Sequence, residues 1–268
     1  KLATLYKQDL KWMLRGARAR STKQKSRIER FEKISAIEAP REINTLELKS
    51  LATRLGNTTI ELDHISKAFG DNVLFEDFSY NLLRMDRIGT IGKNGCGKST
   101  LCKLINRSIE PTKGNIYIND ICLNDYSLRT IRDNIIYVGQ KEKIFTGTIK
   151  ENIMLNQNDE IKFQKICKIC LIDLIVNKRK FRYNFGISND SINLSGGEKQ
   201  RIILARALMK DSKILVLDEA LSETDYFMEK TIINNIIKNF PYKTLIYVSH
   251  KKIDNLFERA INIGENYE

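Results

Sequence analysis

The chain has 268 residues, of which 42% are hydrophobic and 29% are charged. This composition suits one large α/β domain with an appendage, or two small domains. No uninterrupted run of about 18 apolar residues occurs, so the sequence lacks the pattern of a membrane-spanning helix. The five cysteines lack the paired spacing of a zinc site and are interpreted as reduced thiols of a cytosolic protein.

Positive charge is concentrated at the N-terminus. The formal net charge is +12, and residues 1–34 hold eleven Lys or Arg against three Asp or Glu, a local balance of +8. Residues 1–35 are predicted to be helical, and such a basic segment favours an anionic partner, with nucleic acid the first candidate. A solvated helix face without a partner is the alternative. We predict a basic helical segment with its linker at 1–58 and a main domain at 59–268.

A glycine-rich segment lies inside the main domain. From Thr59 an alternation of apolar residues predicts a strand, and a further strand is predicted at 88–91, before a helix that opens near Leu101. Between them, Gly92 to Ser99 fits G-x-x-x-x-G-K-[ST], a loop whose backbone N–H groups and lysine bind phosphate groups. A chance match in a loop is the competing interpretation, and the flanking strand and helix argue against it.

The rest of the main domain alternates strands with helices. Strands are predicted at 115–118, 135–139, 213–218 and 244–249, and helices at 159–178, 197–209 and 226–239. Several of the strands are continuous apolar runs, which is typical of a strand buried on both faces. We therefore expect an α/β fold with a mostly parallel sheet and helices on both sides.

Two further segments carry groups suited to phosphate chemistry. Asp218 and Glu219 end a predicted apolar strand, where one acid can bind Mg²⁺ and the other can polarise water; a plain surface turn is the alternative. Ser195 and two glycines precede an amphipathic helix, which makes a second anion-binding helix start. One nucleotide does not need both helix starts in one chain. The second is therefore expected to serve a nucleotide on another domain.

These motifs occur in the order found in one family. The segments are the loop 92–100, Gln140, Leu194–Gln200, Asp218-Glu219, Ser222 to Asp225 and His250. The chain resembles the nucleotide-binding domain of ABC ATPases over about 59–268. The resemblance implies a P-loop NTPase fold of ABC type, with a helical signature subdomain at about 141–209 and an antiparallel β subdomain. It implies ATP and Mg²⁺ as cofactors and hydrolysis of ATP to ADP and phosphate.

The resemblance also assigns roles to single residues. Phe69 is similar to the aromatic residue that stacks on adenine, although by itself it could equally belong to the core. The implied nucleotide-binding residues are Phe69, Gly92, Asn94, Gly95, Gly97, Lys98, Ser99, Thr100, Ser195 and Gly197. The implied catalytic residues are Glu219, His250, Gln140 and Lys98, and the implied metal-binding residues are Ser99, Gln140 and Asp218.

The resemblance implies a head-to-tail dimer that closes on ATP. Ser195 and Gly197 resemble the signature that caps the partner's γ-phosphate, and Asp225 matches the aspartate of the loop that links the two active sites. Glu223 departs from the pattern, because that loop usually has a small apolar residue there. The second domain of such a dimer can be a copy of this chain or a different ABC ATPase domain.

Separate segments resemble two different ABC subfamilies: residues 10–20, 25–32 and 54–61 resemble one, and Tyr137 to Gln140 and Phe145 to Ile153 resemble the other. Residues 1–113 resemble the ABC-F class, soluble tandem ATPases that act on ribosomes, and residues from about 114 onward resemble the ATPase domains of peptide or bacteriocin exporters. A hybrid joined near Lys113-Gly114, at a surface turn, is one interpretation; a single divergent ABC protein is the other. The exporter resemblance implies transmembrane domains as partners, and the ABC-F resemblance implies ribosome or tRNA contact through residues 1–35. Either way we expect a cytoplasmic location, with the inner face of the membrane as the exporter case.

Overall fold

The computed structural model of the chain describes residues 58–92, 95–140, 142–155, 157–188, 193–249, 256–257 and 259–263. The chain divides into two units, Lys1–Glu42 and Ile43–Glu268, and every described residue lies in the second. The predicted helix at 1–35 therefore falls outside the described residues, and the division at 58/59 stays a prediction.

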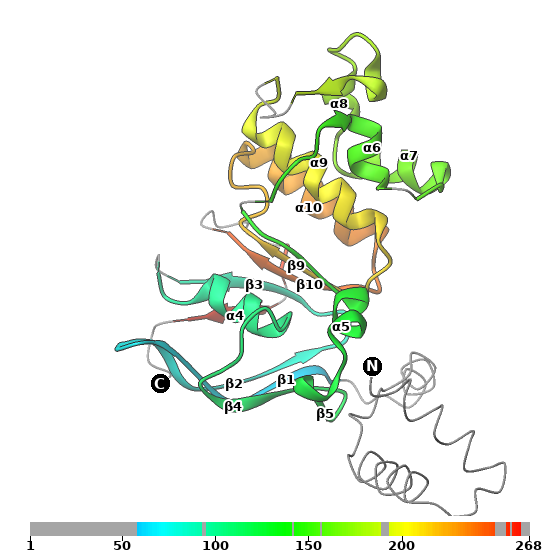
Figure 1. Cartoon of the computed structure of the whole chain (residues 1–268). Coiled ribbons are helices and arrows are strands. Elements are labelled where there is room, and N and C mark those ends of the chain that lie inside the picture. Colours follow the sequence, from blue (N-terminus) through cyan, green and yellow to red (C-terminus); the bar gives the residue numbers. More distant parts are fainter. Residues whose placement is uncertain are drawn as a thin grey trace, which may run out of the picture. The chain divides into compact units, whose positions relative to one another are not determined.

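A five-stranded parallel sheet forms the centre of the described unit (Figure 1). Its strands are β3 (Arg87–Ile91), β6 (Ile135–Val138), β9 (Ile214–Asp218), β10 (Thr244–Val248) and β11 (Arg259–Asn262), in the order β11-β3-β10-β9-β6. Each neighbouring pair runs parallel. Along β9, Leu215 and Leu217 belong to one buried cluster and Val216 to another, so both faces of the sheet are covered. This burial explains the continuous apolar runs and confirms the predicted parallel sheet.

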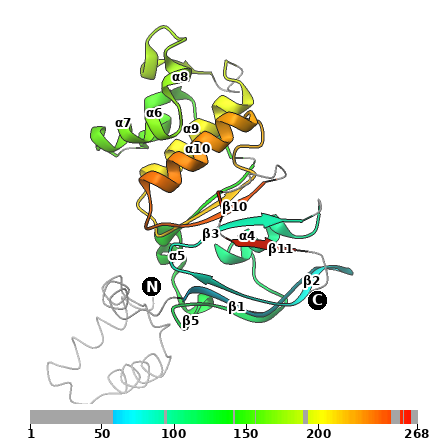
Figure 2. The ribbon, with the colours of Figure 1, turned by 180° about the vertical axis from the view of Figure 1, so that it is seen from behind.

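An antiparallel sheet packs on one side of the parallel sheet, with a helix between them. Its strands are β1 (Thr58–Phe69), β2 (Asn72–Leu83), β4 (Lys113–Ile118) and β5 (Ile121–Cys122), in the order β2-β1-β4-β5. Helix α4 (Lys98–Ile105) lies between the two sheets in both ribbon views (Figures 1 and 2). Leu101 of α4 shares one buried cluster with Leu62 of β1 and Ile246 of β10. The predicted antiparallel β subdomain is confirmed.

The other side of the parallel sheet carries helices. They are α6 (Ile149–Met154), α7 (Glu160–Ile169), α8 (Asp173–Val176), α9 (Gly196–Met209) and α10 (Tyr226–Asn239). Helices α6 and α7 contact α9, and a short antiparallel pair, β7 (Gly147–Thr148) and β8 (Gly186–Ile187), lies beside them. Several of these helices start at side-chain caps: Thr148 caps α6, Asp159 caps α7 and Asp225 caps α10. A helical layer with these elements matches the predicted signature region, whose bounds at 141–209 stay a prediction.

The predicted helix at 159–178 is wrong as a single element. Helix α7 ends at Ile169, Leu171 takes a left-handed φ of +55°, and α8 begins at Asp173. A left-handed residue after the last turn is how many helices end, usually at glycine. Here a leucine takes that place, and Arg201 Nη1 of α9 donates to its carbonyl oxygen at 2.9 Å. The sequence contains no glycine or proline there, so the break depends on a contact with a distant helix.

Two other features of the fold bear on the sequence predictions. Helix α5 (Leu128–Asn134), capped by Ser127, was not predicted and leads directly into β6. Lys113 and Gly114, where a junction was predicted in a surface turn, instead begin β4, and Lys113 pairs with Ser66 of β1.

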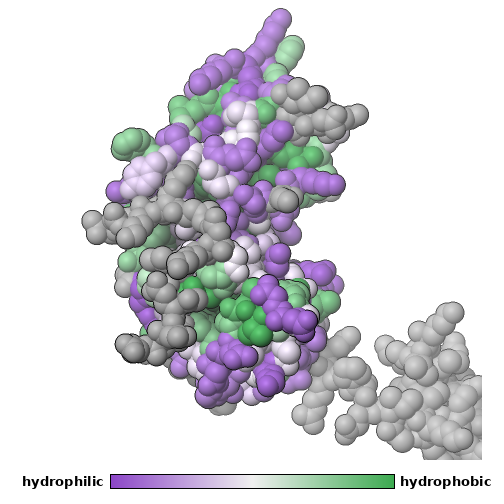
Figure 3. Space-filling view, turned by 90° about the vertical axis from the view of Figure 1, so that its left-hand side faces the viewer, coloured by the Kyte–Doolittle hydropathy of each residue, from purple (hydrophilic) through white to green (hydrophobic). Residues whose placement is uncertain are grey.

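No helix within the described ranges has the length and apolar character needed to cross a membrane. Hydrophilic and hydrophobic side chains are interspersed over the face drawn in Figure 3.

Candidate active site

The phosphate loop connects β3 to α4, and glycine conformations shape it. Gly95 and Gly97 have φ values of +82° and +101°, in the left-handed region that favours glycine. Gly97 is the N-cap of α4, no described side chain caps this helix start, and Phe75 closes the space beside it, because a Cβ on Gly97 would lie 3.1 Å from the Phe75 ring. Backbone N–H groups at such an uncapped helix start can donate hydrogen bonds to phosphate oxygens.

Two residues of the loop reach other parts of the site. Lys98 is buried, and its Nζ donates to the Gly92 carbonyl oxygen across the loop. Ser99 Oγ donates to Asp218 Oδ1 at 2.9 Å, which joins the start of α4 to the end of β9. The structure therefore brings together two residues that lie far apart in the sequence. Their oxygen atoms are the type that Mg²⁺ prefers.

Asp218 accepts a second hydrogen bond from a residue that the sequence analysis did not select. Tyr137 on β6 donates its hydroxyl to Asp218 Oδ2 at 2.8 Å. Burial and this hydrogen bond to Asp218 raise the pKa of Tyr137 well above its ordinary value, so the phenol stays protonated and donates. The Asp218 side chain, in a residue only 4% exposed, is thus held at both oxygens. The clue available in the sequence was the position of Tyr137 on the strand that leads to Gln140.

Glu219 follows Asp218 and lines the same cavity as the phosphate loop. This cavity of about 350 Å³ is bounded by Leu74, Gly95, Gly97, Lys98, Ser99, Thr100 and Glu219. Glu219 has a φ of +53°, a conformation that costs energy for a residue with a side chain. Its backbone N–H donates to the Val248 carbonyl oxygen at 3.0 Å, which fixes this turn to β10. A lysine, a hydroxyl and a carboxylate therefore face one space.

Two further predicted site residues, Phe69 and Gln140, are not among those that line the cavity at the phosphate loop. Phe69 ends β1 and is 53% exposed, with Lys67 Nζ 4.9 Å from its ring centroid, so it does not belong to the core. Gln140 is exposed just beyond the end of β6 and is not among the residues that line the cavity. Asn94 and His250 lie outside the described residues. Their roles stay predictions.

The signature segment begins α9 with a reciprocal cap. Ser195 Oγ accepts from the Glu198 backbone N–H at 3.3 Å, and Glu198 Oε2 accepts from the Ser195 N–H at 3.0 Å. Arg179 makes two hydrogen bonds to the Glu198 carboxylate, at 2.6 and 3.1 Å. Burial alone would raise the pKa of Glu198, but Arg179 and the Ser195 N–H outweigh it and lower that pKa. Arg179 is a second residue that the sequence analysis missed.

The loop after Glu219 is tied to the signature helix. Gln200 of α9 donates to Ser222 Oγ at 3.0 Å and accepts from the Glu223 backbone N–H at 2.9 Å. The Glu223 carboxylate lies against the first residue of α9, because a Cβ on Gly196 would be 1.6 Å from Glu223 Oε2. The signature and the loop from Ser222 to Asp225 therefore form one structural unit within this chain.

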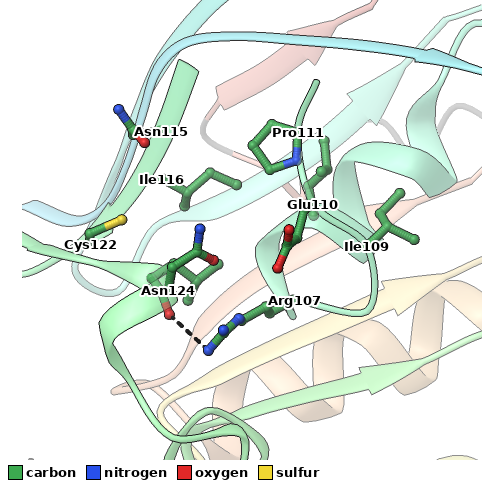
Figure 4. A pocket seen from close by; sticks show the side chains of 10 residues that line it. Arg107, Ile109, Glu110, Pro111, Asn115, Ile116, Cys122 and Asn124 are labelled. Atoms are coloured by element: carbon green, nitrogen blue, oxygen red, sulfur yellow. Dashed lines mark hydrogen bonds between the residues drawn. The ribbon is translucent and has the colours of Figure 1, made fainter. Parts of the chain in front are cut away.

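A smaller pocket lies elsewhere, beside β4 and β5 (Figure 4). Its volume is about 10 Å³, room for about one water molecule. Arg107, which points into it, donates to the carbonyl oxygens of Leu123 at 3.5 Å and Tyr126 at 2.7 Å. These bonds fix the turn after α4 to the segment that leads to α5, so we interpret the pocket as a packing feature.

Three features together define an ATP-binding domain of the ABC type. They are the glycine-rich loop between β3 and α4, the acidic pair that begins at the end of β9, and the serine cap at the start of α9. The comparisons with known proteins agree with this class. The profile of the family described as ABC transporter matches residues 75–222, more than half of the chain. The chain belongs to this family, whose ATP-binding domain hydrolyses ATP.

Several curated relatives are transport and processing proteins. The lactococcin-G-processing and transport ATP-binding protein LagD of Lactococcus lactis subsp. lactis is 34% identical over 234 residues, which is 85% of this chain and 33% of the relative. The transport/processing ATP-binding protein ComA of Streptococcus pneumoniae serotype 4 is 31% identical over 207 residues, 76% of this chain and 28% of the relative. The chain thus spans about a third of the length of these relatives.

A solved structure shows the same fold. It is described as a bacterial Atm1-family ABC exporter with ATP bound, and it aligns with a TM-score of 0.73 at 23% identity over 78% of this chain and 37% of that one. The predicted likeness to exporter ATP-binding proteins is confirmed by the transport/processing relatives, without a restriction to the later part of the chain. The family profile crosses the predicted junction at 113–114 as one match, and the comparisons give no support to the ABC-F likeness or to a hybrid.

Proposed function

We propose that the chain acts as the ATPase domain of an exporter-type ABC transporter and hydrolyses ATP in a dimer that closes on the nucleotide. The observation that carries this proposal is the hydrogen bond of 2.9 Å between Ser99 and Asp218. It joins the phosphate loop to the acidic pair, and Glu219 of that pair lines the same cavity as Lys98. These are the groups that positioning and charge stabilisation of a phosphoryl transfer require.

Each residue has a defined task in this proposal. The N–H groups of the loop and Lys98 bind the β- and γ-phosphates and offset their negative charge. Glu219 orients the water molecule for attack on the γ-phosphorus and accepts its proton. Gln140 and His250 contact the attacking water and the γ-phosphate, as the family resemblance implies. Phe69, exposed at the end of β1, stacks on the adenine.

Mg²⁺ fits the donor set at the end of β9. Ser99 Oγ and Asp218 Oδ1 already lie within hydrogen-bond distance, and both are oxygen ligands suited to this ion. The described residues contain no group of three or more His, Cys, Asp or Glu side chains that could hold a metal. A shared arrangement with phosphate oxygens is therefore more suitable than an all-protein cage. When bound, Mg²⁺ would neutralise charge on the β- and γ-phosphates.

The second half of the pocket would come from another domain. Ser195 caps α9 and Gly197 lies in its first turn, where a helix N-terminus can bind a phosphate of the partner's nucleotide. The partner is a second copy of this chain or a different ABC ATPase domain. Because the chain spans about a third of relatives named as ATP-binding transport proteins, we also propose transmembrane domains as partners.

The test is the rate of ATP hydrolysis as a function of protein concentration. A self-associating ATPase gives a rate that rises with the square of concentration when dimer is scarce. Glu219→Gln should reduce turnover by about 100-fold and leave an ATP-bound dimer that size-exclusion chromatography can detect. Turnover that survives this substitution, or a specific activity independent of concentration for a chain that stays monomeric with ATP, would contradict the proposal.

The alternative is a ribosome-associated factor of the ABC-F class. It is favoured by the +8 balance of residues 1–34 alone, since the comparisons do not support it. Ribosome sedimentation at low and high salt, with the full chain and with a chain that lacks residues 1–35, separates the two functions. Salt-sensitive binding that is lost with the deletion would favour the alternative.

A further inference from the structure

Tyr137 binds the Asp218 carboxylate oxygen that Ser99 does not bind. Asp218 Oδ1 accepts from Ser99 at 2.9 Å, and Oδ2 accepts from Tyr137 at 2.8 Å. The two donors come from α4 and β6, so each carboxylate oxygen has its own partner and the orientation of the carboxylate is fixed. β6 is the direct neighbour of β9, and Tyr137 pairs with Val216. The phenol is therefore fixed by the sheet rather than by a loop.

Gly139, two residues along the chain, leaves room for this ring. A Cβ on Gly139 would lie 3.0 Å from both the Cε1 and the hydroxyl oxygen of Tyr137, which is closer than side chains normally approach. A methyl group there would require the phenol ring to shift by a few tenths of an ångström, which would disturb its hydrogen bond to Asp218. The geometry thus depends on two residues, one that donates the hydrogen bond and one that leaves space for the donor.

We propose that Tyr137 is a positioning residue for the Mg²⁺ site, an inference that rests on the proposed function. When Ser99 binds a metal ion through an oxygen lone pair, its hydroxyl proton can still donate to Asp218 Oδ1. Tyr137 continues to donate to Oδ2, so Oδ1 stays directed at the phosphate loop. Without the phenol hydroxyl, the buried carboxylate would lose a partner for one oxygen and would be free to turn.

The consequence is a specific loss of metal affinity. Tyr137→Phe keeps the ring and removes only the hydroxyl, so packing of the strand should change little. We expect the affinity of the ADP complex for Mn²⁺ to fall about tenfold, as for loss of one hydrogen bond to a charged group. Electron paramagnetic resonance of Mn²⁺ with ADP measures this without any turnover. In the ATPase assay, the Mg²⁺ concentration at half-maximal rate should rise by a similar factor, while kcat at saturating Mg²⁺ changes by less than about threefold.

A matched control exists in the helical layer. Tyr183 also donates its hydroxyl to an aspartate, Asp173, and burial together with this bond raises its pKa. Tyr183→Phe removes an equivalent hydrogen bond far along the chain from the phosphate loop and should leave Mn²⁺ affinity unchanged. If both variants lower thermal stability and neither changes Mn²⁺ affinity, Tyr137 is only structural and the proposal is wrong.

Gly139→Ala provides a second variant that retains the hydroxyl. Its methyl group should shift the Tyr137 ring by a few tenths of an ångström, strain the hydrogen bond to Asp218 and weaken Mn²⁺ binding in the same direction, even if Tyr137→Phe folds poorly. Unchanged Mn²⁺ affinity in this variant would also count against the proposal. Failure of the proposed function has a different outcome: the wild-type chain would then bind neither ADP nor Mn²⁺ with ADP, whatever residue stands at 137.

Discussion

Two helices of this molecule begin at sites predicted to receive phosphate, and their first turns differ. Helix α4 starts at Gly97 with no cap from a described side chain and no acidic residue in its first turn. Helix α9 starts at Ser195, which forms a reciprocal cap with Glu198. The N–H groups at α4 are available to a nucleotide bound by this chain alone, whereas α9 already satisfies part of its own N-terminus. We therefore expect α4 to bind phosphate in the monomer, and α9 to stay stable without ligand until a partner brings one.

The largest expected effect tests the α4 site. Lys98→Ala removes the buried ammonium group that lines the cavity and should abolish ATP binding, with hydrolysis reduced by more than about 100-fold. Isothermal titration with ATP and a phosphate-release assay measure the two quantities. Lys103, exposed in the last turn of the same helix, is the control, and Lys103→Ala should bind ATP normally. Normal ATP affinity in Lys98→Ala would contradict the assignment of the α4 start as the phosphate site of the monomer.

The next effect tests the α9 site. Ser195→Ala removes the cap and the hydroxyl proposed to contact the partner's nucleotide, so hydrolysis should fall about tenfold while ATP affinity of the monomer stays the same. Ser127→Ala is the matched control, because Ser127 caps α5 with a hydrogen bond of 3.1 Å to Thr130 N–H. Both variants should lose about 1 kcal/mol of stability. An equal loss of activity in both would mean that Ser195 acts only through folding.

A smaller effect concerns the ion pair that supports the α9 start. Arg179→Met should lower the free energy of unfolding by about 1 kcal/mol at neutral pH, since Glu198 loses a partly buried partner. The folded-state pKa of Glu198 is lowered, so this stabilisation is present above the unfolded pKa of about 4.5 and is lost as pH falls through the folded pKa. Urea unfolding at pH 7 and at a pH of about 3.5 measures the difference between wild type and variant. A difference that does not shrink at the lower pH would contradict the assigned ion pair.

The sequence predicted those features that a short segment determines by itself. It did not predict features that depend on contacts with residues far away in the chain. The strand before Gly92 and the helix after it followed from apolar runs and the glycine spacing, because one short segment contains all the information. The donor role of Tyr137 could not be predicted, since it depends on β6 lying next to β9 rather than beside another strand. The break at Leu171 likewise depends on Arg201, which lies 30 residues further along the chain.

The smallest expected effect concerns Glu223, whose charge bears on phosphate binding at the start of α9. Its carboxylate lies beside Gly196 at the start of α9, where an anion is favoured by the helix dipole when no phosphate is present. A phosphate from a partner's nucleotide would bring a second negative charge to the same place, so the two would repel. Glu223→Gln should therefore strengthen ATP-dependent association about threefold, measured by sedimentation in the Glu219→Gln background. Glu110→Gln, which removes the same charge at an exposed turn before β4, should have no effect. Weaker association in Glu223→Gln would mean that this carboxylate contacts the partner favourably, and that charge repulsion does not weaken phosphate binding at the start of α9.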